Sequence, residues 1–281
     1  MEQASSHCIL CNSSDRSVLI QQGDWIIKKC MGCGLGFLDP QPDSETLKRL
    51  YRDSYFNSQY DKGLTVNSPE MKRRISQEDH RVKFVRCFKK SGKVVDLGCG
   101  RGYFLHACKL RGYNTEGVDI SSDGAQYVRK ELNIPVRVGN IDDIDFERNS
   151  IDVITMWHFL EHTADPHRHI AKAKKWLKKD GVLIIDVPNY EGTDAQKMWD
   201  RWYGWQAPYH LFHFTPATLH LLLSKHGFEI RKRKKYHSEY VKERLKRYPF
   251  ISLVARLIAT RYSGTSYAVI ATKNEWSRSG E

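Results

Sequence analysis

The chain has 281 residues and carries 45 Lys and Arg against 33 Asp and Glu, which gives a net charge of +12. This length allows one core of about 190 residues with a small appendage. No apolar run approaches the ~20 residues that cross a bilayer, which argues against a transmembrane helix. The charge is uneven: residues 231–281 hold thirteen Lys or Arg and four acids, so the rest of the chain is close to neutral.

Two cysteine pairs stand at the front of the chain. Cys8-x-x-Cys11 and Cys30-x-x-Cys33 are separated by eighteen residues, a spacing that matches a zinc ribbon. Four thiolates fill a tetrahedral shell, so the zinc is expected to be structural rather than catalytic. The sequence predicts a ribbon over residues 1–40.

The alternative for these cysteines is a pair of disulfides in a secreted protein. Residues 1–20 lack the basic start and apolar core of a signal peptide. Cys87, Cys99 and Cys108 follow no paired pattern, which fits a reducing, cytoplasmic compartment. A helical linker or cap is expected over residues 41–90. Four aromatic residues in it are candidates to close over a cofactor: Tyr51, Tyr55, Phe56 and Tyr60.

A glycine-rich turn follows a short apolar strand. Residues 93–97 read as a strand, and they lead into Asp96-Leu-Gly98-Cys-Gly100-Arg-Gly102 and then a helix over 103–111. Such a turn lets backbone N–H groups approach a ligand closely at a helix N-terminus. The acid before the glycines distinguishes it from the dinucleotide fingerprint G-x-G-x-x-G.

Strands and helices then alternate, which predicts a parallel, doubly wound sheet. Another nucleotide-binding Rossmann domain is the plainer alternative. The expected strands are 114–119, 135–138, 152–156 and 182–187, and the expected helices are 122–132 and 165–178.

The glycine turn, in register with Asp119 at the end of the next strand, resembles motif I of the class I S-adenosylmethionine (SAM) methyltransferases. Three later segments resemble the ubiquinone-biosynthesis O-methyltransferase-like subgroup found in polysaccharide and secondary-metabolite pathways: Asp186-Val-Pro-Asn-Tyr190, Pro208 to Pro216, and Leu221 to Phe228. The resemblance implies an α/β, Rossmann-like sheet of seven strands over 91–281. It places an insertion at 189–215 and an antiparallel closing strand at 266–272. The distribution of charge adds a basic C-terminal segment at 231–262.

The resemblance also implies a set of cofactor contacts. Asp119 would accept hydrogen bonds from the ribose hydroxyls, and the segment after the third strand would hold the adenine. Asn140 stands where the family often has Asp, and its side-chain oxygen could still accept from the adenine amino group. The implied SAM-binding residues are Asp96, Gly98, Gly100, Gly102, Asp119, Ile120, Asn140, Ile141 and Trp157.

Histidines are the candidates for proton transfer from the methyl acceptor. His210 and His213 lie in the insertion, which in this fold is above the SAM methyl group, and His162 follows the fourth strand. A histidine near its ordinary pKa of ~6.5 can take a proton from a hydroxyl or amine. The alternative is that these side chains only hydrogen-bond the loop. An aromatic cluster nearby would form a wall or lid of the acceptor site, or pack the loop on the sheet: Trp199, Trp202, Tyr203 and Trp205.

Glu161 and His162 occupy the position where the ubiquinone-type enzymes bind a divalent ion that orients a catechol. Further carboxylates would help to bind such an ion, but the neighbouring positions are Trp157, His158 and Phe159. One carboxylate and one imidazole make a poor site for a hard cation. The sequence therefore favours metal-free transfer.

Apolar residues near the C-terminus follow helical spacing from Pro249 onward. Phe250, Leu253 and Leu257 belong to one face, for which core packing is the expected use. Basic residues flank this face, so it also suits a helix lying at a membrane surface or near a lipid-linked substrate, through residues 242–261.

The sequence thus predicts a SAM-dependent methyltransferase that modifies an oxygen or nitrogen of a small molecule, sugar or metabolite. The alternative is an RNA methyltransferase that uses the ribbon and the basic segment to bind RNA. Two features weigh against nucleic acid. Asp186-Val-Pro-Asn189 lacks the N/D-P-P-Y/F pattern of many enzymes that methylate base amines, and the ribbon is nearly balanced in charge.

Overall fold

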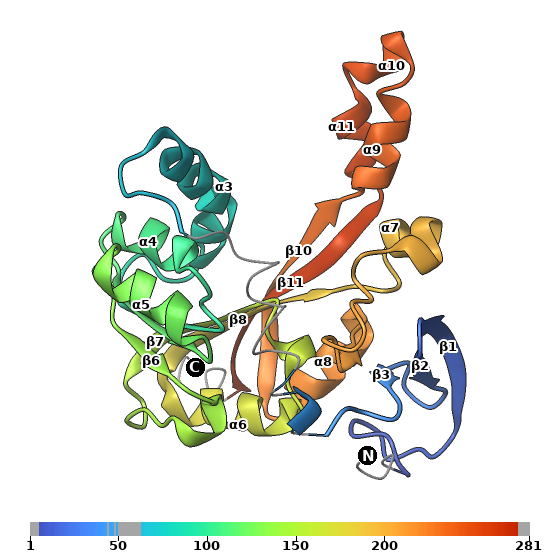
Figure 1. Cartoon of the computed structure of the whole chain (residues 1–281), viewed down its shortest axis with the longest axis horizontal. Helices are drawn as coiled ribbons and strands as arrows, with labels where there is room; N and C mark the ends of the chain where they lie inside the picture. The colour runs from blue at the N-terminus through green and yellow to red at the C-terminus, as the bar shows by residue number, and fades with distance from the viewer. Residues whose placement is uncertain (1–5, 44, 48, 50–62, 275–281) are drawn as a thin grey trace, which may run out of the picture.

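The computed structural model describes residues 6–43, 45–47, 49 and 63–274, which form two sheets flanked by helices (Figure 1). The aromatic residues proposed to cover the cofactor, Tyr51, Tyr55, Phe56 and Tyr60, lie outside the described residues. The larger sheet has seven strands in the order β10-β11-β8-β7-β4-β5-β6. Their bounds are β4 Lys93–Leu97, β5 Asn114–Asp119, β6 Val136–Val138, β7 Ile151–Trp157, β8 Leu177–Pro188, β10 Phe228–His237 and β11 Ser263–Lys273.

The pairing confirms the expected α/β fold. β4 is parallel to β5 and β7, β5 is parallel to β6, and β7 is parallel to β8. β11 is antiparallel to both β8 and β10, as expected for the closing strand. The predicted helix over 165–178 ends two residues early, because Leu177 already pairs with Ile151 at the start of β8.

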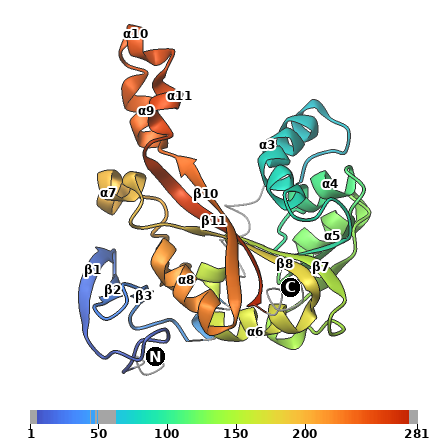
Figure 2. The same cartoon turned by 180° about the vertical axis from the view of Figure 1, so that it is seen from behind.

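The central strands bury side chains on both faces, because successive residues of a strand point to opposite sides. Val94 and Val153 belong to one apolar cluster with α3, α4 and α5, whereas Val95 and Ile154 belong to another with α6 and α8. The two faces are therefore covered by different helices (Figures 1 and 2). Helix bounds are α3 Pro69–Arg86, α4 Tyr103–Lys109, α5 Ser122–Lys130, α6 Pro166–Trp176, α7 Thr193–Met198 and α8 Pro216–Lys225.

The smaller sheet contains the N-terminal segment and one strand from elsewhere. β1 Arg16–Gln22, β2 Trp25–Cys30 and β3 Gly36–Leu38 form an antiparallel meander, and β3 also pairs with β9 Phe212–His213. β9 comes from the predicted insertion at 189–215. The ribbon expected over residues 1–40 is therefore completed by the insertion, and its buried residues share a cluster with α6 and α8.

The basic run at residues 231–235 lies within β10, an edge strand that pairs with β11 alone among the described strands. Exposed edge strands present unpaired backbone groups, and Lys side chains there oppose pairing with another chain. Part of the positive charge of the C-terminal region therefore protects this edge.

Three short helices connect β10 to β11 and stand away from the body as an arm (Figures 1 and 2). They are α9 Glu239–Leu245, α10 Pro249–Ser252 and α11 Ala255–Ala259. The expectation that the apolar face near Pro249 packs in the core is wrong, because Phe250 is 95% exposed and Leu253 91%. The arm buries small side chains, Ala255 and Ala259, against its neighbouring helices. No helix in the described part of the chain is long and apolar enough to cross a membrane.

Candidate active site

The glycine turn between β4 and α4 has a backbone that other residues would strain. Gly98, Gly100 and Gly102 have φ values of +76°, +51° and +67°. A Cβ atom at Gly98 would lie 2.6 Å from a ring carbon of Phe159. Both observations require glycine at Gly98. The backbone N–H groups of Gly98 and Gly102 donate to the carbonyls of Val118 and Cys99, so the turn is held by its own hydrogen bonds.

Asp119 at the end of β5 holds this turn in place. Its carboxylate accepts hydrogen bonds from the backbone N–H of Gly100, at 2.7 Å, and from that of Ser121, at 2.8 Å. Burial raises the pKa of Asp119 above its ordinary value, although these two donors act in the opposite direction. A carboxylate has about four acceptor sites, so two remain for ribose hydroxyls. Ile120 beside it is 54% exposed.

The segment predicted to hold the adenine forms a short turn of helix, η1 Ile141–Asp143. The Asn140 side chain caps it by accepting from the backbone N–H of Asp142 at 3.0 Å. Ile141 is buried beneath this turn. The cap fixes the turn and occupies one lone pair of the Asn140 oxygen, so an adenine contact by this residue stays a prediction.

A cavity of about 480 Å³ opens beside the glycine turn. It brings together seven of the twelve residues predicted to bind the cofactor or to transfer the proton: Asp96, Gly98, Gly100, Gly102, Trp157, His162 and His210. Five others do not line it: Asp119, Ile120, Asn140, Ile141 and His213. The cavity thus joins the predicted methionine end of the cofactor site to the histidines of the acceptor side.

Helix α3 contributes three charged residues to the cavity that sequence analysis missed: Arg74, Glu78 and Arg81. Glu78 is buried and accepts from both arginines, with 3.1 Å to Nη1 of Arg81. The Arg81 guanidinium also stacks 4.9 Å from the centre of the Trp157 ring. Because these residues are spaced by four and three positions, they lie on one face of the helix. This spacing is the feature of the sequence that could have revealed them.

Asp96 lies in the same part of the cavity and is 4% exposed. Burial raises its pKa to about 8. The Thr155 hydroxyl, which donates at 2.6 Å, and the charge of Arg81 favour the carboxylate, whereas Glu78 opposes it. Asp96 therefore carries a proton at neutral pH unless a cation enters the cavity.

His210 and His162 lie edge to face, with ring centres 4.6 Å apart. Nδ1 of His210 is 2.8 Å from the carbonyl of Gly204, and Nδ1 of His162 is 3.0 Å from that of Tyr209. Because a carbonyl only accepts, each Nδ1 carries the hydrogen and each Nε2 is the basic nitrogen. Burial lowers the pKa of both rings, that of His210 well below its ordinary value, so both are neutral at pH 7.

Glu161 adds a carboxylate to this pair. It is 1% exposed, and its oxygens accept no hydrogen bond from the described residues, although Nδ1 of His158 lies 3.3 Å away. Ligand atoms of Glu161, His162 and His210 all lie within 4.8 Å of one another. Only Glu161 and His162 are neighbours in the sequence, whereas His210 is distant in the chain, so the sequence indicated two ligands here. The set fits a divalent metal that accepts nitrogen and oxygen ligands better than a hard cation such as Mg²⁺.

Of the other candidate residues in the insertion, some are packed in the core and one lines the cavity. His213 on β9 is buried beside Trp205, with ring centres 5.3 Å apart, and burial lowers its pKa to about 3. Trp202 and Trp205 are also buried, which fits the packing alternative. Tyr203 lines the cavity and is 62% exposed, as a wall residue would be.

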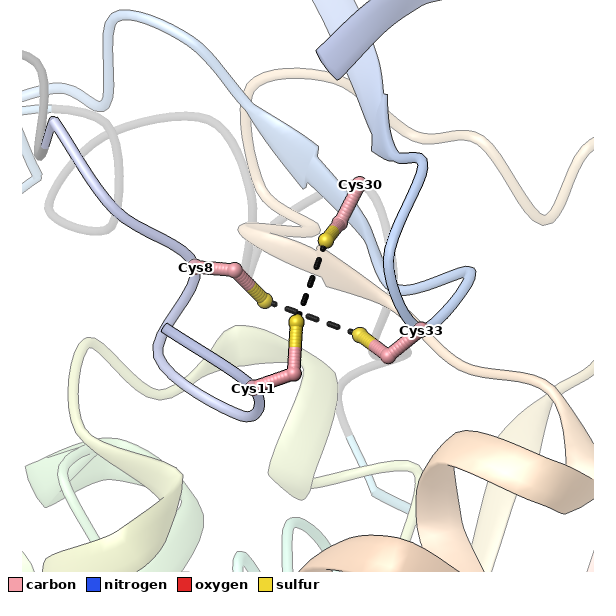
Figure 3. Close-up of side chains that lie close together, drawn as sticks. All are labelled: Cys8, Cys11, Cys30 and Cys33. Carbon is pink, nitrogen blue, oxygen red and sulfur yellow. Dashed lines mark hydrogen bonds between the residues drawn. The ribbon is translucent and has the colours of Figure 1, made fainter. Parts of the chain in front are cut away.

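The four cysteines of the ribbon converge on one point, with no disulfide between them (Figure 3). Sγ of Cys8 is 3.6 Å from that of Cys33, and Sγ of Cys11 is 3.4 Å from that of Cys30. A tetrahedron of thiolates with Zn–S bonds of ~2.3 Å has S–S edges of about 3.8 Å. The backbone N–H of Leu10 donates to Cys8 Sγ, as in a zinc knuckle. These residues fit a structural zinc, and none of the four lines the cavity.

Comparisons with known proteins identify the family to which this fold belongs. The ubiquinone biosynthesis O-methyltransferase of Actinobacillus pleuropneumoniae is 35% identical over 107 residues, which cover 34% of this chain and 46% of that protein. The Coxiella burnetii protein of the same name is 30% identical over 105 residues, which cover 36% and 45%. The chain thus spans about half the length of the curated relatives it matches.

Solved structures show the same fold. A SAM-dependent methyltransferase from Archaeoglobus fulgidus has a TM-score of 0.53 at 23% identity, covering 71% of this chain and 94% of that one. One from Mesorhizobium loti has a TM-score of 0.51 at 16% identity, covering 69% and 96%. The family model described as a methyltransferase domain matches residues 70–233, more than half of the chain. The chain therefore belongs to this methyltransferase family and is a SAM-dependent methyltransferase.

Proposed function

We propose that the protein transfers the methyl group of SAM to an oxygen or nitrogen of a small molecule, sugar or metabolite. One observation carries the proposal: the glycine turn and the His162–His210 pair line the same cavity. Its size is that of a small-molecule site. The relatives described as O-methyltransferases support an oxygen acceptor. No comparison named above is described as acting on RNA, and the proposal does not extend to an RNA acceptor.

The reaction is an in-line substitution at the methyl carbon. The bond from carbon to the sulfonium sulfur breaks as the bond to the acceptor forms, and the acceptor proton must leave. Nε2 of His210 carries no proton and is our proposed acceptor for that proton. Burial lowers the pKa of this ring well below the ordinary value, so His210 is a weaker base than the sequence led us to expect. Holding the reactants in line supplies much of the remaining acceleration.

We further propose that the charged residues of the cavity bind the amino-acid end of SAM. This end carries one ammonium and one carboxylate. Asp96 and Glu78 offer negative charge and Arg74 and Arg81 positive charge within the same cavity. Arginine binds a carboxylate in a bidentate fashion, which fixes its orientation as well as its position.

The same reasoning assigns zinc to the ribbon. We propose one Zn²⁺ per chain, held by Cys8, Cys11, Cys30 and Cys33. Four thiolates leave no open coordination position, so this ion would stabilise the ribbon and take no part in methyl transfer.

The proposed function is tested by titrating SAM into the protein and then measuring methyl incorporation into panels of catechols, sugars, amines and RNA. Binding of SAM with transfer to a small hydroxyl or amine compound is the expected result. Transfer to RNA alone would overturn the proposed acceptor class while leaving the enzyme class in place.

Asp119→Ala is expected to weaken SAM binding by about 30-fold or more. Two ribose hydrogen bonds of ~1 kcal/mol each are lost. The turn also loses the acceptor for Gly100 N–H. Calorimetry gives the affinity, and Asp123→Ala, an exposed acid on α5, is the matched control. Unchanged affinity in Asp119→Ala would refute the assignment.

Binding of SAM is expected to release about one proton at pH 7. Asp96, with a pKa of about 8, is protonated in the free protein. The ammonium of SAM lowers that pKa, so the proton leaves as the cation binds, and affinity rises as the pH is raised toward 8. Calorimetry in buffers of different ionisation enthalpy counts the protons. Equal release by the wild type and Asp96→Asn would contradict this role of Asp96.

A further inference from the structure

The far end of the arm exposes a group of large apolar side chains. Phe250 is 95% exposed, Leu253 91% and Leu257 71%, and Ile251 and Val254 beside them are also exposed. In both views α10 forms the end of the arm that is farthest from the sheets (Figures 1 and 2). Single exposed apolar residues are common, but a contiguous group marks a contact surface.

Positive charge surrounds this apolar end. Residues 239–262 hold six Lys or Arg and two glutamates. Both glutamates are engaged, Glu239 by Lys242 and Glu243 by Lys246. Arg247, Arg256 and Arg261 are exposed, and they form no ion pair with any residue that the structure describes. Their charge is available to an anionic partner.

The base of the arm is firmly attached to the body. Asp194 of α7 is buried and accepts from the Ser238 hydroxyl and from the backbone N–H of Glu239 at 3.2 Å. It also accepts from the Thr265 hydroxyl at 3.2 Å. Thr265 and Ser266, which follow the arm on β11, line the cavity. The exposed end therefore belongs to an ordered element rather than to a loose tail.

We propose that the arm, residues 239–262, docks on an anionic lipid bilayer. Binding at a membrane surface requires apolar side chains on a helix and basic side chains beside them. The apolar side chains enter the boundary of the acyl chains, and the basic side chains pair with lipid phosphates. A second copy of this chain is disfavoured as the partner, because two surfaces of the same positive sign repel one another. The inference concerns a surface outside the cavity and does not depend on the proposed acceptor.

Vesicle co-sedimentation of the full chain tests the proposal. We expect binding to vesicles that contain phosphatidylglycerol in phosphatidylcholine and weak binding to phosphatidylcholine alone, with the difference abolished at high salt. Phe250→Ser/Leu253→Ser should weaken binding about 100-fold, since two large side chains no longer enter the bilayer. Arg247→Glu/Arg256→Glu should remove the preference for anionic lipid. Val18→Ser/Leu110→Ser replaces two exposed apolar residues elsewhere and should bind as the wild type does.

Calorimetry with SAM confirms that each variant is folded, and analytical ultracentrifugation reports its oligomeric state. Vesicle binding that is unchanged in both arm variants would overturn the proposal. A wild-type dimer that dissociates in Phe250→Ser/Leu253→Ser, without any vesicle binding, would assign the surface to a second copy instead.

Discussion

His210→Ala is expected to lower kcat by about 10²–10⁴-fold while the affinity for SAM is retained. His210 lines the cavity, and the Gly204 carbonyl fixes its tautomer so that Nε2 can accept a proton. SAM affinity should hold because the His210 side chain is hydrogen-bonded within the insertion, at the Gly204 carbonyl, whereas the proposed ribose contacts are made by Asp119 on β5. Steady-state rates with the true acceptor and calorimetry with SAM separate the two quantities.

His210→Asn preserves a polar side chain but cannot take the proton, so it separates positioning from basicity. His220→Ala, an exposed histidine on α8, is the matched control.

The alternative role of this cluster is to bind a divalent metal, and a chelator tests it. Loss of activity that is restored by a divalent ion would assign Glu161, His162 and His210 to a metal. Full activity of both His210 variants would show that His210 is not the base, and that methyl transfer depends on alignment of the reactants alone.

The parts of the site that follow short-range patterns could be predicted from the sequence. The glycine turn was recognisable because positive φ at Gly98 and Gly102 demands glycine, and each turn has to follow a buried strand. The cysteines were recognisable because a zinc ribbon requires two C-x-x-C pairs at such a spacing. The glycine turn and each C-x-x-C pair span only a few residues, so they can be recognised without knowledge of the tertiary structure.

Other parts depend on contacts between distant segments and left no such signal. β9 has two residues, too few for a strand periodicity, and it exists because it pairs with β3. In the arm, by contrast, the sequence carries a clear pattern that misleads: the spacing of its apolar residues is that of a helix packed in a core. The sequence could not show that nothing in the described body covers Phe250.

Cys30→Ser/Cys33→Ser is expected to remove the zinc and unfold the ribbon, because structural zinc contributes ~10–16 kcal/mol to folding in small zinc domains. SAM affinity should hold, since no cysteine ligand lines the cavity. The rate should nevertheless fall. Leu211, next to His210, donates its N–H to the Glu161 carbonyl at 2.8 Å, and its own carbonyl accepts from Leu38 N–H of the ribbon at 2.9 Å.

The ribbon therefore supports the segment that carries His210, and its loss should lower kcat without moving the affinity for SAM. Zinc analysis, calorimetry and rate measurements on the same sample check the three parts of this prediction, with Cys87→Ser as the control for a thiol outside the cluster. Zinc retained by the double variant would contradict the ligand set. Zinc loss with an unchanged rate would show that the pairing of β3 with β9 is dispensable for placing His210, and that the insertion holds its shape through Trp202 and Trp205 alone.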